Sequence, residues 1–278
     1  MHAYVAVRTA LLARRASTIV RLLRPADLVP FTLAVLFGGI LAAGPGVAQS
    51  DALPVFILAA LSALLGRASW NTLLEGREFR SEEPDSSKPP ERPSPGLRIP
   101  PSIARSVGTG MGALALICAA LAGLGHLGVA MAVASLMYLV GSDRRRLAAI
   151  APWFEVILMG IAVVYGSLRV GPNTPVWLGA GLAVLLTLSR EFIAGERERT
   201  IQLALVIIVG TVVASLVPFL YLGFGGIYLV ALVVTDAILL RAVWLLIVQR
   251  AGYIGRSSHV LLWGMFAGLL SFALYWVG

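Results

Sequence analysis

The stretch "GRASWNTLLEGREFRSEE", from Gly66 to Glu83, joins a long apolar block to a cluster of carboxylates. Of the 278 residues, 58% are hydrophobic and 13% are charged, about half the charged share of an ordinary globular protein. Only 14 residues are acidic, and six of these lie between Asn71 and Gly96. An apolar block that ends in charge is typical of a helix leaving a bilayer. The sequence therefore indicates an integral membrane protein whose partner is the lipid bilayer.

The length of the apolar blocks predicts how many helices cross the membrane. A spanning helix needs about 20 mostly apolar residues. Nine blocks meet this requirement, and they cover 26–45, 52–74, 103–123, 125–141, 152–170, 175–193, 200–222, 226–248 and 258–277. Since lipid leaves backbone groups no partner but the helix itself, we expect an all-α, polytopic membrane bundle of nine transmembrane helices over 25–278, with a polar loop at 75–101.

The basic residues predict the orientation of the chain. Nineteen of the 22 basic residues fall in the N-terminal tail or in every second loop, which places these segments in the cytosol. The N-terminus is then cytosolic, and the C-terminus lies on the opposite side. The pI of about 10.4 thus reflects membrane anchoring, and we expect no nucleic-acid partner. All basic residues but Lys88 are arginine, which suggests a GC-rich bacterial genome and hence the inner (cytoplasmic) membrane.

The first 24 residues carry five arginines and no acid. A signal or transit peptide would have such a composition. A basic amphipathic segment on the cytosolic surface would have it too. Because no A-x-A-like cleavage site follows a suitable apolar core, we favour the surface segment for 1–24.

Four polar residues at the end of the second block share a helical spacing. Asn71, Glu75, Glu78 and Glu82 follow one another at steps of four, three and four, which return to one face of a helix. Carboxylates on one face repel each other unless a cation lies between them, and Mg²⁺ is a suitable cation. The alternative is a solvated acidic helix end.

A second polar face is expected after the sixth block. Glu191, Gly195, Glu198 and Gln202 repeat the same spacing, also on the predicted cytosolic side. Two such faces opposite each other would hold a metal-bridged diphosphate between them.

Four charges lie within or at the edge of apolar blocks: Arg67, Glu155, Asp236 and Arg241. Charges inside a membrane are costly and are usually paired or line a functional cavity. Asp236 and Arg241 are five residues apart and so do not share a helix face. We expect each to pair with another helix, with Arg67 and Glu155 as available partners.

Several motifs together resemble the UbiA superfamily of intramembrane prenyltransferases. That family has nine transmembrane helices and two aspartate-rich motifs, which follow helices two and six. The matching segments here are "RLLRPADLVPFTLAVLFGGILA" near the N-terminus, Asn71 at the first motif, "KPPERPSPG" from Lys88, "YLVGSDRRRLAAIAPWFEVILMG" and "REFIAGERE" from Arg190. Glutamates replace the family's aspartates in the first motif, and Gly195 stands where the second motif has an acid.

The resemblance implies roles for individual residues. Catalytic residues would be Asn71, Glu75, Glu78 and Glu198, and Mg²⁺ would be held by Glu75, Glu78, Glu82 and Glu198. The polyprenyl diphosphate would contact Lys88, Arg92, Arg144, Arg145 and Arg190. The ring faces of Trp70, Tyr138 and Tyr165 would stabilise cationic character.

Three functions compete. The resemblance favours a prenyltransferase that moves a prenyl group from a polyprenyl diphosphate to an acceptor within the membrane. A catalytically lapsed relative that binds or carries an isoprenoid lipid is the second. A small transporter is the third, although transporter sites usually lie at the membrane midplane and these polar residues lie at one face.

Overall fold

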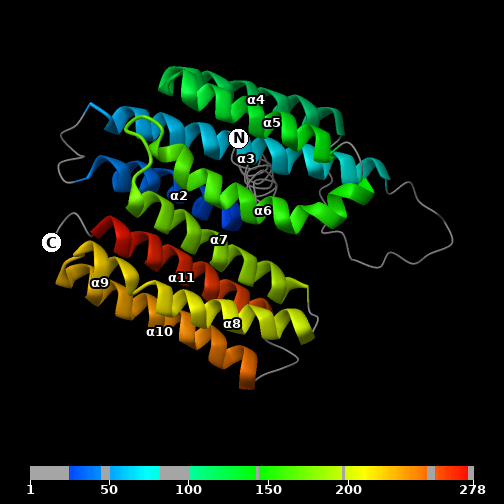
Figure 1. The fold of residues 1–278 in the computed structure, drawn as a ribbon. Helices are drawn as coiled ribbons and strands as arrows, with labels where there is room; N and C mark the ends of the chain where they lie inside the picture. The colour runs from blue at the N-terminus through cyan, green and yellow to red at the C-terminus, as the bar shows by residue number, and fades with distance from the viewer. Residues whose placement is uncertain are drawn as a thin grey trace, which may run out of the picture.

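The computed structural model describes residues 25–44, 51–81, 101–141, 144–195, 198–248 and 254–274. Within these ranges every regular element is a helix (Figure 1). The helices are α2 (Pro25–Ala43), α3 (Leu53–Ser81), α4 (Pro101–Ala122), α5 (Leu124–Gly141), α6 (Arg144–Ser167), α7 (Thr174–Ala194), α8 (Glu198–Ala214), α9 (Val217–Leu222), α10 (Gly226–Val248) and α11 (Ile254–Leu274). The predicted basic segment 1–24 lies outside the described residues.

The nine predicted blocks all coincide with helices, which confirms the all-α membrane bundle. The block 200–222 contains two of them, α8 and α9, because the chain turns at Ser215 and Leu216, just before Pro218. Among the described residues, five segments are long and apolar enough to cross a membrane: Leu53–Leu74, Ser102–Ala122, Thr174–Ala194, Arg199–Tyr221 and Gly226–Val248. The same part of the chain contains four shorter apolar helices: Leu28–Ala43, Leu124–Leu139, Pro152–Ser167 and Val260–Phe272.

Two helices extend into segments that the sequence predicts as loops. α3 continues to Ser81, so residues 75–81 of the predicted loop 75–101 are helical. α6 begins at Arg144, well before the predicted start at residue 152. Hydropathy detects only the part of a helix that lies in lipid. Glutamate and arginine are good helix formers, so the helix persists beyond the apolar layer.

Consecutive membrane-crossing helices run in alternating directions (Figure 1). The C-terminal ends of α3, α5, α7 and α10 therefore gather at one end of the bundle, where α4, α6, α8 and α11 begin. The helix ends that flank the arginine-rich connections thus all lie at this end, which we call the polar end.

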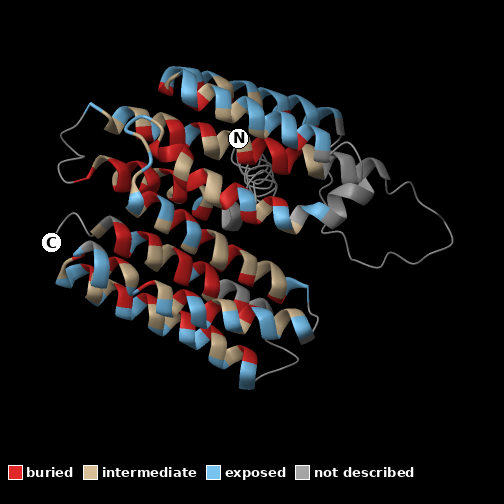
Figure 2. Ribbon diagram, viewed as in Figure 1, coloured by how far each residue is buried: buried red, intermediate tan, exposed pale blue. Residues whose placement is uncertain are grey.

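Burial is concentrated in the middle of the bundle. Buried residues follow α2, α3, α6, α7 and α11, whereas α4, α5 and α10 keep many apolar side chains exposed (Figure 2). Leu121, Leu124 and Trp244 are examples of these exposed side chains. In a membrane protein such surfaces face lipid tails, so apolar exposure carries no cost.

The backbones of α2 and α6 approach each other very closely at two glycines. A Cβ atom on Gly38 would collide with the carbonyl oxygen of Val163, and one on Gly166 would collide with the carbonyl oxygen of Val35. The two helices therefore touch backbone to backbone at a pair of glycines. Since lipid tails are as apolar as protein side chains, this close packing replaces hydrophobic burial as the force that holds the helices together.

The charges of α10 do not use the partners that the sequence suggests. Arg67 of α3 and Glu155 of α6 pair with each other, and their side-chain atoms approach to 2.7 Å. Asp236 instead accepts a hydrogen bond from the hydroxyl of Ser215, at 3.3 Å. The expected pairing across to Arg67 or Glu155 is wrong because α10 packs against α11 and α8, away from α3 and α6.

The α2–α6 contact makes a testable prediction. Replacing Gly38 or Gly166 by alanine forces the two backbones apart, and overpacking of this kind typically costs about 1–3 kcal/mol. We expect a clear drop in the midpoint of thermal unfolding of the detergent-solubilised protein. Gly181→Ala is the matched control, because a Cβ there meets nothing within 4 Å. Equal midpoints for Gly166→Ala and Gly181→Ala would contradict the inferred contact.

Candidate functional site

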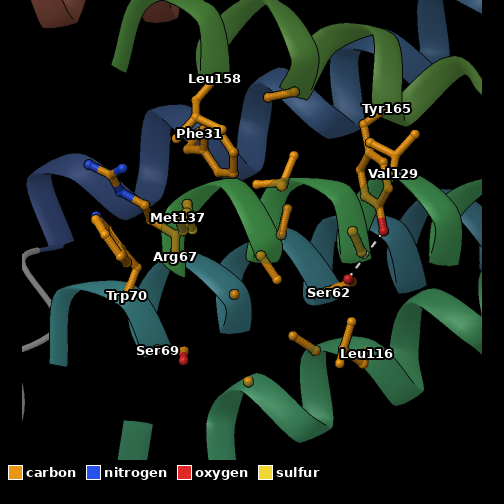
Figure 3. Close-up of a pocket in the computed structure, with 18 of the residues that line it drawn as sticks. Phe31, Ser62, Arg67, Ser69, Trp70, Leu116, Val129, Met137, Leu158 and Tyr165 are labelled. Atoms are coloured by element: carbon orange, nitrogen blue, oxygen red, sulfur yellow. Dashed lines mark hydrogen bonds between the residues drawn. The ribbon is translucent and has the colours of Figure 1, made fainter. Parts of the chain in front are cut away.

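A cavity of about 470 Å³ lies between α2, α3, α4, α5 and α6 (Figure 3). Its volume is within the range of about 300–1,000 Å³ that small-molecule sites occupy. The lining is almost wholly apolar, with small residues that leave room between the helices. It includes Phe31 and Val35 from α2, Ala63 and Gly66 from α3, Gly112 and Ala113 from α4, Val133 and Ala134 from α5, and Leu158 and Ala162 from α6. Such a space suits a hydrocarbon chain.

One helix connects the cavity to the polar end of the bundle. Along α3 the cavity wall runs from Ser62 to Leu74. The helix then continues without a break through Glu75 and Glu78 to Ser81. Glu75 therefore follows directly after the last cavity residue, and Glu78 lies one turn further on the same side of the helix. The side chains of these two glutamates are not described.

Asn71 lies just inside this transition. Its side chain is buried, one turn before Glu75. Its neighbour Trp70 lines the cavity and packs against Phe154 of α6, with ring centroids 6.3 Å apart. The first predicted motif therefore begins with a residue that is buried in the bundle.

An ion pair lies in the cavity wall near its polar half. Arg67 lines the cavity, is only 7% exposed, and contacts Glu155 through one guanidinium nitrogen. Its other two nitrogens, Nε and Nη1, have no hydrogen-bond partner among the described residues. The pair ties α3 to α6 beside the cavity. Hydropathy reveals the two charges in the sequence, but only the fold reveals that they meet.

A hydroxyl contact sets the spacing of α3 and α4, which pack closely along their length. The Ser69 hydroxyl donates to the carbonyl oxygen of Gly108 at 2.7 Å, and a Cβ on Gly108 would collide with Leu73. The absence of a side chain at Gly108 therefore lets α4 approach the part of α3 that precedes Glu75.

The two predicted tyrosines lie at different levels of the cavity. Tyr138 lines it from α5, towards the polar end, and is 68% exposed. Tyr165 lines it from α6, is buried, and donates a hydrogen bond to the Ser62 hydroxyl at 3.2 Å (Figure 3). The two rings therefore cannot both stabilise positive charge on the same reacting carbon.

The predicted basic contacts are placed only in part. Arg144 and Arg145 begin α6 at the polar end, and their side chains are not described. Arg190 is half-buried near the end of α7. Glu82, Lys88 and Arg92 lie outside the described residues.

The second predicted polar face is not continuous. α7 ends at Ala194, Gly195 caps it with φ −71° and ψ −10°, and α8 begins at Glu198. Glu191 and Glu198 therefore belong to two different helices, so the expected single face is wrong. The physical reason is that α7 and α8 pack against each other in opposite directions, which requires the chain to reverse between them.

The described residues of the second predicted motif do not line the cavity. Among the described residues that line it, every one comes from α2 to α6. The C-terminal end of α7 and the start of α8, which carry Arg190 and Glu198, lie at the polar end of the bundle, as does the C-terminal end of α3 (Figure 1).

No group of three acidic, histidine or cysteine side chains that could hold a metal ion is found among the side chains that the structure describes. The predicted ligands Glu75, Glu78, Glu82 and Glu198 are not part of that set. What the backbone does place is a pair of glutamates one helical turn apart, just beyond the last α3 residue that lines the cavity, and carboxylate oxygens are the ligands that Mg²⁺ prefers.

Comparison of the sequence with known protein families gives no match, and comparison with curated proteins gives none. Comparison with solved structures does give matches. The fold is similar to that of a solved digeranylgeranylglyceryl phosphate synthase, a prenyltransferase of the UbiA superfamily. The TM-score is 0.66 with 19% sequence identity, over 94% of this chain and 98% of the other. The chain therefore has a UbiA-like fold, as its motifs predict.

The buried ion pair makes a prediction about stability. Glu155→Gln leaves the Arg67 charge without its partner inside the bundle, and breaking a buried pair in this way costs about 3–5 kcal/mol. We expect a value at the low end, because the Glu155 side chain is 32% exposed. SDS-unfolding titration in mixed micelles measures the loss.

The matched control for this prediction removes both charges. In Arg67→Met/Glu155→Gln no uncompensated charge remains, so the double variant should be more stable than Glu155→Gln alone. If the double variant is the less stable of the two, the pair does not act as inferred.

Proposed function

We propose that this protein is an intramembrane prenyltransferase that moves a prenyl group from a polyprenyl diphosphate to an acceptor. One observation carries the proposal: the helix α3 lines an apolar cavity as far as Leu74 and then continues directly into a pair of glutamates. An amphipathic substrate with a hydrocarbon tail and a charged head matches this division. The UbiA-like fold supports the same class of reaction.

The tail of the donor would lie in the cavity between α2 and α6. Its walls offer apolar surface from five helices, and burying each CH₂ group is worth about 0.8 kcal/mol. The cavity would thus hold the donor in one direction, with its first carbon towards Trp70 and its tail towards Ser62. The same walls exclude water from the tail and from the carbon next to the head.

The diphosphate would lie at the polar end, beyond Leu74. Glu75 and Glu78, with Glu82 and Glu198, would hold Mg²⁺, which when bound neutralises the charge that develops on the departing diphosphate. Arg144 and Arg145 begin α6 at the same end and would contact the diphosphate directly. Lys88, Arg92 and Arg190 would add further positive charge.

The bond between the allylic carbon and the diphosphate oxygen breaks, and the diphosphate leaves with the electron pair. The acceptor's nucleophile forms a new bond to the same carbon and loses a proton. Trp70 and Tyr138, which line the half of the cavity nearest the diphosphate, would face the developing positive charge. Tyr165 lies too deep for this role.

The arginine distribution supports an orientation for this reaction. The polar end would face the cytosol of a bacterial cell, with the N-terminus on the same side. A soluble diphosphate product would then leave into the cytosol, while the prenylated product stays in the bilayer.

The proposal predicts that the carboxylates beyond the cavity are essential. The double variant Glu75→Gln/Glu78→Gln should lose transfer by about 10²-fold or more, the size expected when electrostatic support of a transition state is removed. The assay follows label from geranylgeranyl diphosphate into any membrane product, in the presence of Mg²⁺, in membranes that contain the protein. Asp51→Asn is the matched control, because it makes the same acid-to-amide change at the opposite end of the bundle.

One outcome would contradict the proposed activity, and another would contradict the role of the glutamates. If the unaltered protein binds the donor without transferring label, it is a binding or carrier protein with this fold. If transfer occurs and the double variant retains it, the glutamates of α3 are not part of the site.

A further inference from the structure

A hydrogen-bonded bridge between two helices lies at the deep end of the cavity. The hydroxyl of Tyr165 on α6 donates to the hydroxyl of Ser62 on α3, at 3.2 Å, although the residues are 103 positions apart in the chain. Both side chains are buried, and both line the cavity. Figure 3 shows this bridge at one end of the cavity and Arg67 and Trp70 near the other.

The position of the bridge follows from helix geometry. Ser62 precedes Glu75 by thirteen residues on the uninterrupted helix α3. At about 1.5 Å per residue, the two positions lie about 20 Å apart along the helix axis. A donor whose diphosphate lies beyond Leu74 would therefore meet Tyr165 only with the far end of its tail.

We propose that Tyr165, positioned by Ser62, is the wall that limits the length of the prenyl chain that the cavity accepts. The identity of the ligand rests on the proposed function, whereas the wall itself rests on the bridge and its place in the cavity.

The Tyr165 ring is held from two sides. Ser62 fixes its hydroxyl, and the His126 ring packs against it edge to face, with centroids 5.0 Å apart. A hydrocarbon tail cannot replace the hydrogen bond that it would break by pushing the ring aside, and an unpaired buried hydroxyl costs about 1–3 kcal/mol. The tail therefore ends at the ring.

His126 lies behind the Tyr165 ring. His126 is buried, at 2% exposure, at the start of α5, and it is not among the residues that line the cavity. Removing the Tyr165 ring would extend the cavity towards His126. This extra depth would admit a longer tail, whereas loss of the hydroxyl alone would not.

The experiment measures binding, not turnover. Geranyl, farnesyl, geranylgeranyl and hexaprenyl diphosphates compete with a labelled prenyl diphosphate for the full-length protein in nanodiscs. For the unaltered protein, affinity should rise with chain length and then level off or fall. Tyr165→Ala should move that limit to a longer chain and favour it by about tenfold or more, because the added CH₂ groups become buried.

Two matched variants separate volume from hydrogen bonding. Tyr165→Phe keeps the ring and should keep the original limit. Ser62→Ala frees the hydroxyl and should change the profile less than Tyr165→Ala does. Tyr165→Leu removes less volume than Tyr165→Ala and should still move the limit to a longer chain, so it decides the question if Tyr165→Ala does not fold.

The outcomes distinguish this inference from the proposed function. If the unaltered protein binds prenyl diphosphates and a folded Tyr165→Ala or Tyr165→Leu shows the same limit, Tyr165 is not the wall, and the proposed function is unaffected. If no prenyl diphosphate binds to the unaltered protein, the proposed function fails, and the inference fails with it.

Discussion

The backbone contact between α2 and α6 is the constraint on which the cavity depends. At Gly38 and Gly166 the two helices approach so closely that neither residue can carry a side chain. In lipid, where apolar burial drives little association, such contacts determine which helices become neighbours. The contact also aligns Phe31 and Val35 of α2 with Leu158 of α6 along one wall. The glycine contact holds α2 and α6 together. Side chains therefore need not fill the space beside this wall, and a cavity can exist there.

Two polar bridges then fix the distance between α3 and α6 on the other side of the cavity. The Arg67–Glu155 pair lies in its polar half, and the Tyr165–Ser62 hydrogen bond lies at its deep end. Polar groups inside a membrane are stable only when they find partners, so each bridge is specific for its position. The space between them is left to apolar and small residues. This arrangement gives the cavity a direction, with charge at one end and an aromatic wall at the other.

That direction connects the structure to the proposed chemistry. A substrate with a charged head and a hydrocarbon tail can enter such a space in only one orientation. In the proposed function, the head would lie where α3 passes Leu74 and continues as Glu75 and Glu78. The arginines that begin α6 lie at the same end of the bundle. The direction of α3, the apolar lining of the cavity and the charges at the polar end therefore point to the same place for the bond that would break. None of these three observations is sufficient alone.

The sequence by itself determined the apolar part of each helix, because a spanning helix must be about 20 apolar residues long and its flanks carry arginine. It also located Glu75 and Glu78 after the second apolar block. Only the tertiary structure decided that Arg67 meets Glu155, that Tyr165 lies deep in the cavity, and that the chain turns between Glu191 and Glu198. Hydropathy reports each helix separately, whereas these features depend on which helix packs against which, and in lipid that choice is made by close backbone contacts and polar pairs.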